Sequence, residues 1–187
     1  MSLRYAPDTS LVSAVAFRPY MIETAWNYCQ LVLASRFQNG MIEQTLATLS
    51  IEIVLKSFNS VVAANAGQLN EKYVFRLPPD RKATNKHNLV TLVDFLPADV
   101  RSYLIDPQDH DVIHEHQDTF SDSRYFYEPT SPDFSTDAPM KLAVKMICKT
   151  VLLYQTNGCT DPFIVSFNVH EVFFTHVQRI AFVPSAA

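Results

Sequence analysis

One long apolar run constrains the fold of this chain more than any other stretch of its sequence. It extends from Gly40 to Ala66, and its aliphatic residues occupy nearly every position around a helical wheel. Asn39 precedes the run and Gly67 follows it, and such residues readily end helices. A helix that is apolar nearly all round is buried by neighbours on several sides. We therefore expect the helix 40–66 to stand at the centre of a helical bundle.

A narrow polar stripe interrupts this apolar helix. Its members lie three or four residues apart, which places them on one line: Thr45, Thr48, Glu52, Lys56 and Asn59. Two interpretations remain open. The stripe is either the water-facing edge of the helix, with Glu52 and Lys56 as an exposed ion pair of little energetic weight, or the floor of a cleft. In a cleft, Glu52 would bind Arg124, and His87 would stand nearby.

Periodicity and capping signals predict further helices along the chain. We expect them near residues 9–17 (N-capped by Thr9 or Ser10), 19–38, 87–96, from about 99, 108–127, 138–156 and from about 167. The turn at Asn39-Gly40 is short, so the helix 19–38 should pack antiparallel to the central helix. The alternation from Phe163 to Val169 also fits a strand. The fold expected is an all-α, up-and-down bundle of about five to seven helices.

Composition supports one folded domain over residues 1–187. Hydrophobic residues make up 48% and charged residues 18% of the 187 residues, and the net charge is −4. The three cysteines form no CxxC pair, and the sequence shows no signal-peptide core and no apolar run that would span a membrane, so we expect a cytoplasmic protein without metal or cofactor. The 13 Phe and 8 Tyr exceed what one small core buries, which favours a homodimer.

The segment 67–86 is expected to be the longest loop, because Pro78 and Pro79 exclude a continuous helix. It is locally basic, and the candidates for contacts with phosphate or RNA are Arg76, Arg81, Lys82 and Lys86. A solvated loop is the simpler interpretation.

A histidine cluster is the other candidate site, because His110 and His114 have a spacing that can chelate a metal. No further ligand pattern accompanies them or His116, so a solvated acidic helix is expected there.

Three short motifs occur in an order that resembles the HEPN superfamily. They are EIVLK at 52–56, KHNL at 86–89 and SDSRYFYE at 121–128, and the resemblance covers about residues 20–156. It implies an all-α up-and-down bundle, commonly dimeric, in a family that includes ribonucleases of toxin and defence systems as well as inactive binding forms. It also implies a polar cleft formed by Glu52, Lys56, His87, Asn88, Arg124, Tyr125, Tyr127 and Glu128.

The chain departs from the catalytic members of that family at one motif. Those members carry R-x4-6-H near the start of a late helix, whereas Arg124 is followed by YFYEPTSPDF, which contains no histidine. Arg81 and His87 have the spacing but not the position. We therefore expect a non-catalytic domain that binds a nucleotide, RNA or a protein partner. The alternatives are a metal-independent ribonuclease with a divergent site and a helical interaction subunit without a ligand.

Overall fold

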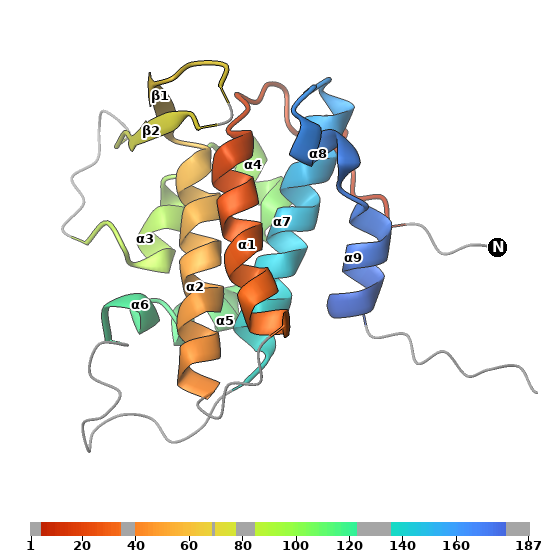
Figure 1. Cartoon of the computed structure of the whole chain (residues 1–187). Helices are drawn as coiled ribbons and strands as arrows, with labels where there is room; N and C mark the ends of the chain where they lie inside the picture. Colours follow the sequence, from red (N-terminus) through yellow and green to blue (C-terminus); the bar gives the residue numbers. More distant parts are fainter. Residues whose placement is uncertain (1–4, 35–39, 69, 78–84, 123–135, 179–187) are drawn as a thin grey trace, which may run out of the picture.

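The fold is mainly α-helical, and its three longest helices lie side by side. The computed structural model describes residues 5–34, 40–68, 70–77, 85–122 and 136–178. Helices α1 (Pro19–Ala34), α2 (Gly40–Ser57) and α7 (Ala138–Thr156) pack against one another, and α1 runs antiparallel to α2 (Figure 1). This arrangement places α2 between neighbours, as its sequence predicts.

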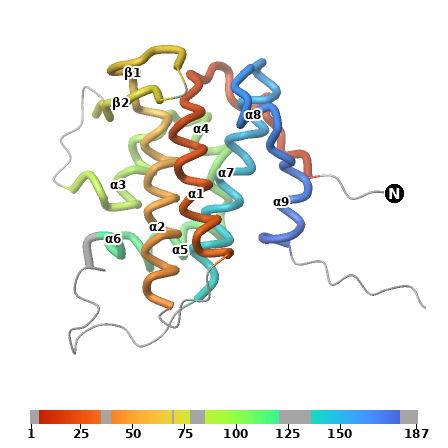
Figure 2. Tube along the Cα trace, viewed as in Figure 1, coloured from red at the N-terminus to blue at the C-terminus, as the bar shows by residue number. Residues whose placement is uncertain are grey.

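Shorter elements cover this helical layer. The helices are α3 (Leu89–Asp94), α4 (Ala98–Leu104), α5 (Asp109–Glu115), α6 (Thr119–Asp122), α8 (Pro162–Ser166) and α9 (Val169–His176). Helices α3 and α6 pack on α2, whereas α8 and α9 pack on α7. A two-stranded antiparallel sheet, β1 (Ser60–Ala64) and β2 (Lys72–Phe75), lies beyond the C-terminal end of α2 (Figure 2). Among the described helices, none has the length and apolar character to cross a bilayer.

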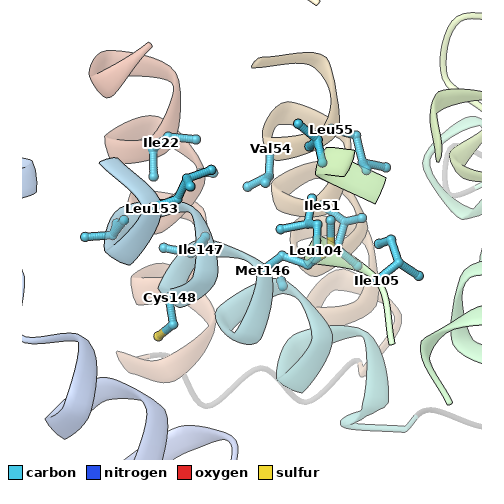
Figure 3. Close-up of a cluster of buried hydrophobic side chains, with 14 of the residues drawn as sticks. Ile22, Ile51, Val54, Leu55, Leu104, Ile105, Met146, Ile147, Cys148 and Leu153 are labelled. Carbon is cyan, nitrogen blue, oxygen red and sulfur yellow. The ribbon is translucent and has the colours of Figure 1, made fainter. Parts of the chain in front are cut away.

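The core lies where α1, α2, α4 and α7 meet. Its buried side chains include Ile22, Ile51, Val54, Leu55, Leu104, Met146, Ile147 and Leu153 (Figure 3). Ser50 allows α1 and α2 to approach closely, since its hydroxyl is fully buried and donates to the carbonyl of Ala25 at 3.0 Å. The three cysteines are free, buried thiols.

The predicted helix 40–66 is wrong beyond Ser57. The hydroxyls of Ser57 and Ser60 bond to backbone carbonyls one turn earlier, an arrangement in which serine competes with continued helix. The following residues then pair as strands, with Val61 opposite Val74, because β-branched residues pack well in strands. Asn65 and Gly67 both have positive φ, 56° and 74°, and turn the chain between the strands. The predicted helical character of the fold is confirmed, and this small two-stranded sheet is added to it.

Three other boundaries differ from the prediction. The N-terminal segment forms only a 3-10 turn, η1 (Thr9–Leu11), and its cap is Asp8. The segment 67–86 contains β2 and is not loop throughout. The predicted helix 108–127 is broken, because the carbonyl of Gln117 accepts the backbone N–H of Leu89 at 3.0 Å, a contact that continued helix would not allow. The described residues thus hold more, shorter helices than the five to seven predicted.

The helices predicted at 19–38, 87–96, from about 99, 138–156 and from about 167 are present, although residues 35–38 of the first lie outside the described residues. Helix α7 has the predicted bounds, and it ends before Gly158, whose φ of 80° is the left-handed value that such an ending requires. Helices α3 and α4 separate at Pro97 as expected. The strand alternative for 163–169 is wrong, since α8 occupies the first part and α9 begins at Val169.

Candidate functional site

A buried carboxylate on α2 is the centre of the candidate site. Glu52 is only 4% exposed, and its Oε1 contacts the Nζ of Lys56 at 2.6 Å and the Nδ1 of His87 at 2.9 Å. Lys56 lies one turn further along α2, and His87 lies in the loop before α3. The water-facing interpretation of the polar stripe is therefore wrong for Glu52, and also for Thr48, which is 1% exposed.

The second oxygen of this carboxylate is unusual. Oε2 of Glu52 is buried and has no hydrogen-bond partner among the residues that the structure describes. A buried carboxylate oxygen without a donor is energetically unfavourable. Arg124 was expected to bind Glu52, and it lies outside the described residues, as do Tyr125, Tyr127 and Glu128. The expected pair stays a prediction.

His87 connects the buried carboxylate to the protein surface. Its side chain is 48% exposed, and its ring stacks on Phe120 of α6, with centroids 5.3 Å apart and planes 27° from parallel. Its Nδ1 faces Glu52, which leaves the opposite edge of the ring on the solvent side. A carboxylate thus orients an imidazole that is open to a ligand, an arrangement used for hydrogen bonding and for proton transfer. We call Glu52, Lys56, His87 and Phe120 the Glu52 cluster.

Asn88 holds the loop that carries His87. Its Oδ1 accepts the backbone N–H of Thr91 at 2.9 Å and caps α3. Its Nδ2 donates to Oε1 of Gln117 at 3.1 Å and to Oδ1 of Asp118 at 3.0 Å. These bonds tie the start of α3 to the segment before α6, and so fix His87 against Phe120. Asn88 is a positioning residue in this arrangement.

Two of the four predicted basic contact residues flank the cluster. Arg76 and Lys86 are exposed, while Arg81 and Lys82 lie outside the described residues. Arg76 follows Phe75, whose ring lies 5.7 Å from the Nζ of Lys56, and Lys86 precedes His87. The two exposed cations therefore stand on segments that both contact the Glu52 cluster.

The histidines of α5 do not assemble a metal site. His110 and His114 are exposed, and His116 is buried at 6% exposure. Within the described ranges, no three His, Cys, Asp or Glu side chains are grouped to hold an ion. Burial lowers the pKa of His116, although nearby Glu115 opposes the shift, and its Nε2 has no hydrogen-bond partner in the described part of the chain.

A second ionic cluster was missed by the sequence analysis. Lys145 and Lys149 of α7 bind Asp109 and Asp106, with Nζ to carboxylate distances of 2.7 Å for Lys145–Asp109 and 2.8 Å for Lys149–Asp106. The signal available was a row of three lysines one turn apart on α7, of which Lys145 and Lys149 are the buried two. Their partners lie about one-fifth of the chain away and carry no motif, so the pairing was not visible in the sequence.

Comparison with protein-family models, with curated proteins and with solved structures finds no match for this chain. The class of protein is therefore described from the structure itself. The chain forms a mainly α-helical fold whose central helix carries a buried, paired carboxylate beneath a half-exposed histidine. The resemblance of the motifs at 52–56, 86–89 and 121–128 to the HEPN superfamily stays an expectation.

Proposed function

We propose that this chain is a non-catalytic, HEPN-like helical bundle that binds RNA, or a free nucleotide of the same chemistry, over the Glu52 cluster. The observation that carries the proposal is the half-exposed His87 ring, held by a buried carboxylate on one side and by Phe120 on the other. Holding an exposed ring in one orientation reduces the entropy lost when a ligand binds to it.

The chemistry of the cluster fits a nucleotide in two respects. Unpaired bases stack on aromatic and histidine rings, and such stacking tolerates many sequences. Exposed Lys86 and Arg76 can neutralise phosphates beside that ring. Because the whole chain carries a net charge of −4, attraction of a polyanion depends on this local pair of cations.

One observation favours a second function, metal-independent cleavage of RNA. A carboxylate that holds one ring nitrogen of a histidine directs the other nitrogen toward substrate, which is the arrangement of many general bases. The Nδ1 of His87 stands 2.9 Å from Oε1 of Glu52. In this alternative, His87 removes the proton from a ribose 2′-hydroxyl, and Arg124 stabilises the phosphate.

Binding and cleavage can be measured on the same labelled single-stranded RNA pool. Anisotropy at two salt concentrations reports binding, and gel analysis with and without EDTA reports cleavage. We expect binding without cleavage. Lys86→Ala should weaken binding and reduce the salt slope by about one unit, and His87→Gln should weaken binding with little change in that slope. Matched controls are Lys141→Ala on α7 and His114→Gln on α5, both exposed away from the cluster.

The outcomes separate the three functions. Cleavage that persists in EDTA and is abolished by both His87→Gln and Arg124→Ala identifies the ribonuclease. If Lys86→Ala and Lys141→Ala weaken RNA binding equally, the binding depends on the overall charge of the protein and the proposed site is rejected. If the wild-type protein neither binds nor cleaves RNA or free nucleotides, the proposed function is wrong, and the remaining candidate is a subunit that binds a protein partner.

A further inference from the structure

A cavity on the opposite side of α7 from α2 has no part in the Glu52 cluster. It has a volume of about 580 Å³, within the range of small-molecule sites, and it lies between the N-terminal segment, α4, the start of α5, α7 and α9. Aromatic side chains from three segments line it, namely Tyr5, Tyr103 and Phe173. Its polar lining comprises two carboxylates, two lysines and three uncharged side chains, namely Asp8, Asp106, Lys145, Lys149, Ser102, Gln108 and Gln178.

The ammonium groups of the two lysines in this cavity already donate all of their hydrogen bonds to the protein. Lys149, 6% exposed, donates to Asp106 and to the carbonyls of Tyr103 and Leu104. Lys145, 12% exposed, contacts one oxygen of Asp106 and donates to both oxygens of Asp109. These bonds hold the turn between α4 and α5 on α7, so the cations have a structural role and no free N–H. The positive charges of Lys145 and Lys149 and the negative charges of Asp106 and Asp109 cancel, so this group of four has no net charge.

Asp106 is the member of the cluster that can bind something more. Its side chain is 35% exposed and lines the cavity, whereas that of Asp109 is 8% exposed. Each of its oxygens accepts one lysine bond, which leaves lone pairs for a donor in the cavity. Burial opposes ionisation, but the bonds from Lys145 and Lys149 outweigh it and hold the pKa of Asp106 below its ordinary range. At neutral pH this group is an acceptor only.

Tyr5 provides a second hydrogen-bonding group at this cavity. Its ring stacks on Phe173, with centroids 3.6 Å apart, and its hydroxyl is buried without a hydrogen-bond partner in the described part of the chain. A buried hydroxyl with no partner destabilises the fold. The Tyr5 ring lines the cavity, and a rotation that brought its hydroxyl to an acceptor on a ligand would recover that hydrogen bond.

We propose that this cavity binds an uncharged planar ring carrying an amide or an equivalent donor–acceptor pair. The N–H group donates to Asp106, the carbonyl or ring nitrogen accepts from Tyr5, and the ring packs on the aromatic walls. An anion is excluded, because its charge would face Asp106 while every lysine donor is taken. The proposal does not depend on the function proposed for the Glu52 cluster, and its test uses neither RNA nor nucleotide.

Two matched pairs of probes test this chemistry on the full chain. Nicotinamide and benzamide have the predicted amide, while nicotinate and benzoate replace it with a carboxylate of the same size. Calorimetry or ligand-observed NMR should detect both amides at millimolar concentration, with the acids at least about tenfold weaker. Failure of both amides to bind, or equal binding of amide and acid, overturns the proposal.

Variants locate the binding in the cavity. Asp106→Asn removes the acceptor charge and leaves the lysines in excess, so the preference should reverse in favour of the acids. Tyr5→Phe should weaken amide binding severalfold without lowering thermal stability, because the hydroxyl that it removes has no partner among the described residues. Tyr73→Phe, which removes the hydroxyl bonded to Glu71 in the hairpin, should leave amide affinity unchanged. If amide binding is the same in Asp106→Asn and Tyr5→Phe as in the wild type, the site lies elsewhere and the proposal fails.

Discussion

Replacing Glu52 with alanine should destabilise the protein far more than the loss of an ordinary surface ion pair. The substitution leaves the ammonium of Lys56 without its partner and removes the group that holds His87. The Glu52 and Lys56 side chains are 5% and 16% exposed, so the pair resembles buried pairs more closely than surface ones. Breaking a buried pair costs about 3–5 kcal/mol, and an exposed pair contributes about 0.2–1 kcal/mol.

The expected loss lies toward the lower part of the buried range. Lys56 can reach water through its partly exposed end, and the exposed side of His87 can be solvated, so both groups regain part of their hydration. We expect Glu52→Ala to reduce the free energy of unfolding by ~2–4 kcal/mol. Because the pair is lost in either single variant, Glu52→Ala/Lys56→Ala should cost clearly less than the sum of the two single substitutions.

Urea unfolding followed by circular dichroism measures these free energies, provided that the m-values agree between variants. The matched control is Lys141→Ala, which breaks an ion pair with Asp137 at the same helical spacing, 2.8 Å long, whose side chains are 40% and 55% exposed. It should cost ~0.5 kcal/mol or less. A Glu52→Ala loss no larger than that of the control would refute the buried-pair reasoning.

The same measurement tests the predicted partner of Oε2. If Arg124 donates to Glu52, Arg124→Ala should also cost ~2–4 kcal/mol, and its effect should shrink in the Glu52→Ala background. Additive effects of the two substitutions would show that Arg124 does not bind Glu52.

Three further predictions concern His116, Asn88 and assembly. Burial lowers the pKa of His116 in the folded state. Neutral His116 therefore contributes its full stabilisation above the unfolded-state pKa of 6.5, and this stabilisation is lost as the pH falls through 6.5 toward the folded-state pKa. Melting temperatures measured between neutral and mildly acidic pH should show this decline, and His116→Gln should flatten it. Asn88→Ala removes a helix cap and two side-chain hydrogen bonds, and it should lower the free energy of unfolding in urea by ~1–2 kcal/mol. A negligible loss would show that the loop before α3 keeps its conformation without Asn88. Light scattering at micromolar concentration should give a dimer mass, and a clean monomer would reject the predicted homodimer.

Much of the helical fold was predictable because its signals are local. Helix α7 combines an apolar face with Asn157-Gly158 at its end, and both can be seen within one window of sequence. The end of α2 was not predictable in this way, since Val61 and Val62 continue the apolar pattern of the helix. Their placement in a strand depends on pairing with β2, which the local pattern does not contain.

The contacts of the candidate site were likewise predictable only where the residues are close in sequence. Glu52 and Lys56 are one turn apart on a single helix, so their contact follows from spacing alone. The contact between Glu52 and His87 joins segments about a fifth of the chain apart. His87 was expected near Glu52 under the cleft interpretation of the polar stripe and through the family resemblance, but no local pattern predicted the contact itself. The bonds of Lys145 and Lys149 to aspartates of another helix had neither spacing nor resemblance to indicate them.

The order of the helices along the chain has a consequence for how this protein is made. Helices α1 and α2 form a local pair that can assemble early, yet α2 also packs on α7, which begins only at Ala138. During synthesis, the side of α2 that packs on α7 stays uncovered until α7 leaves the ribosome. Nascent chains that stop before α7 should therefore be substrates for chaperones and prone to aggregate, whereas chains that include it should be protected from both.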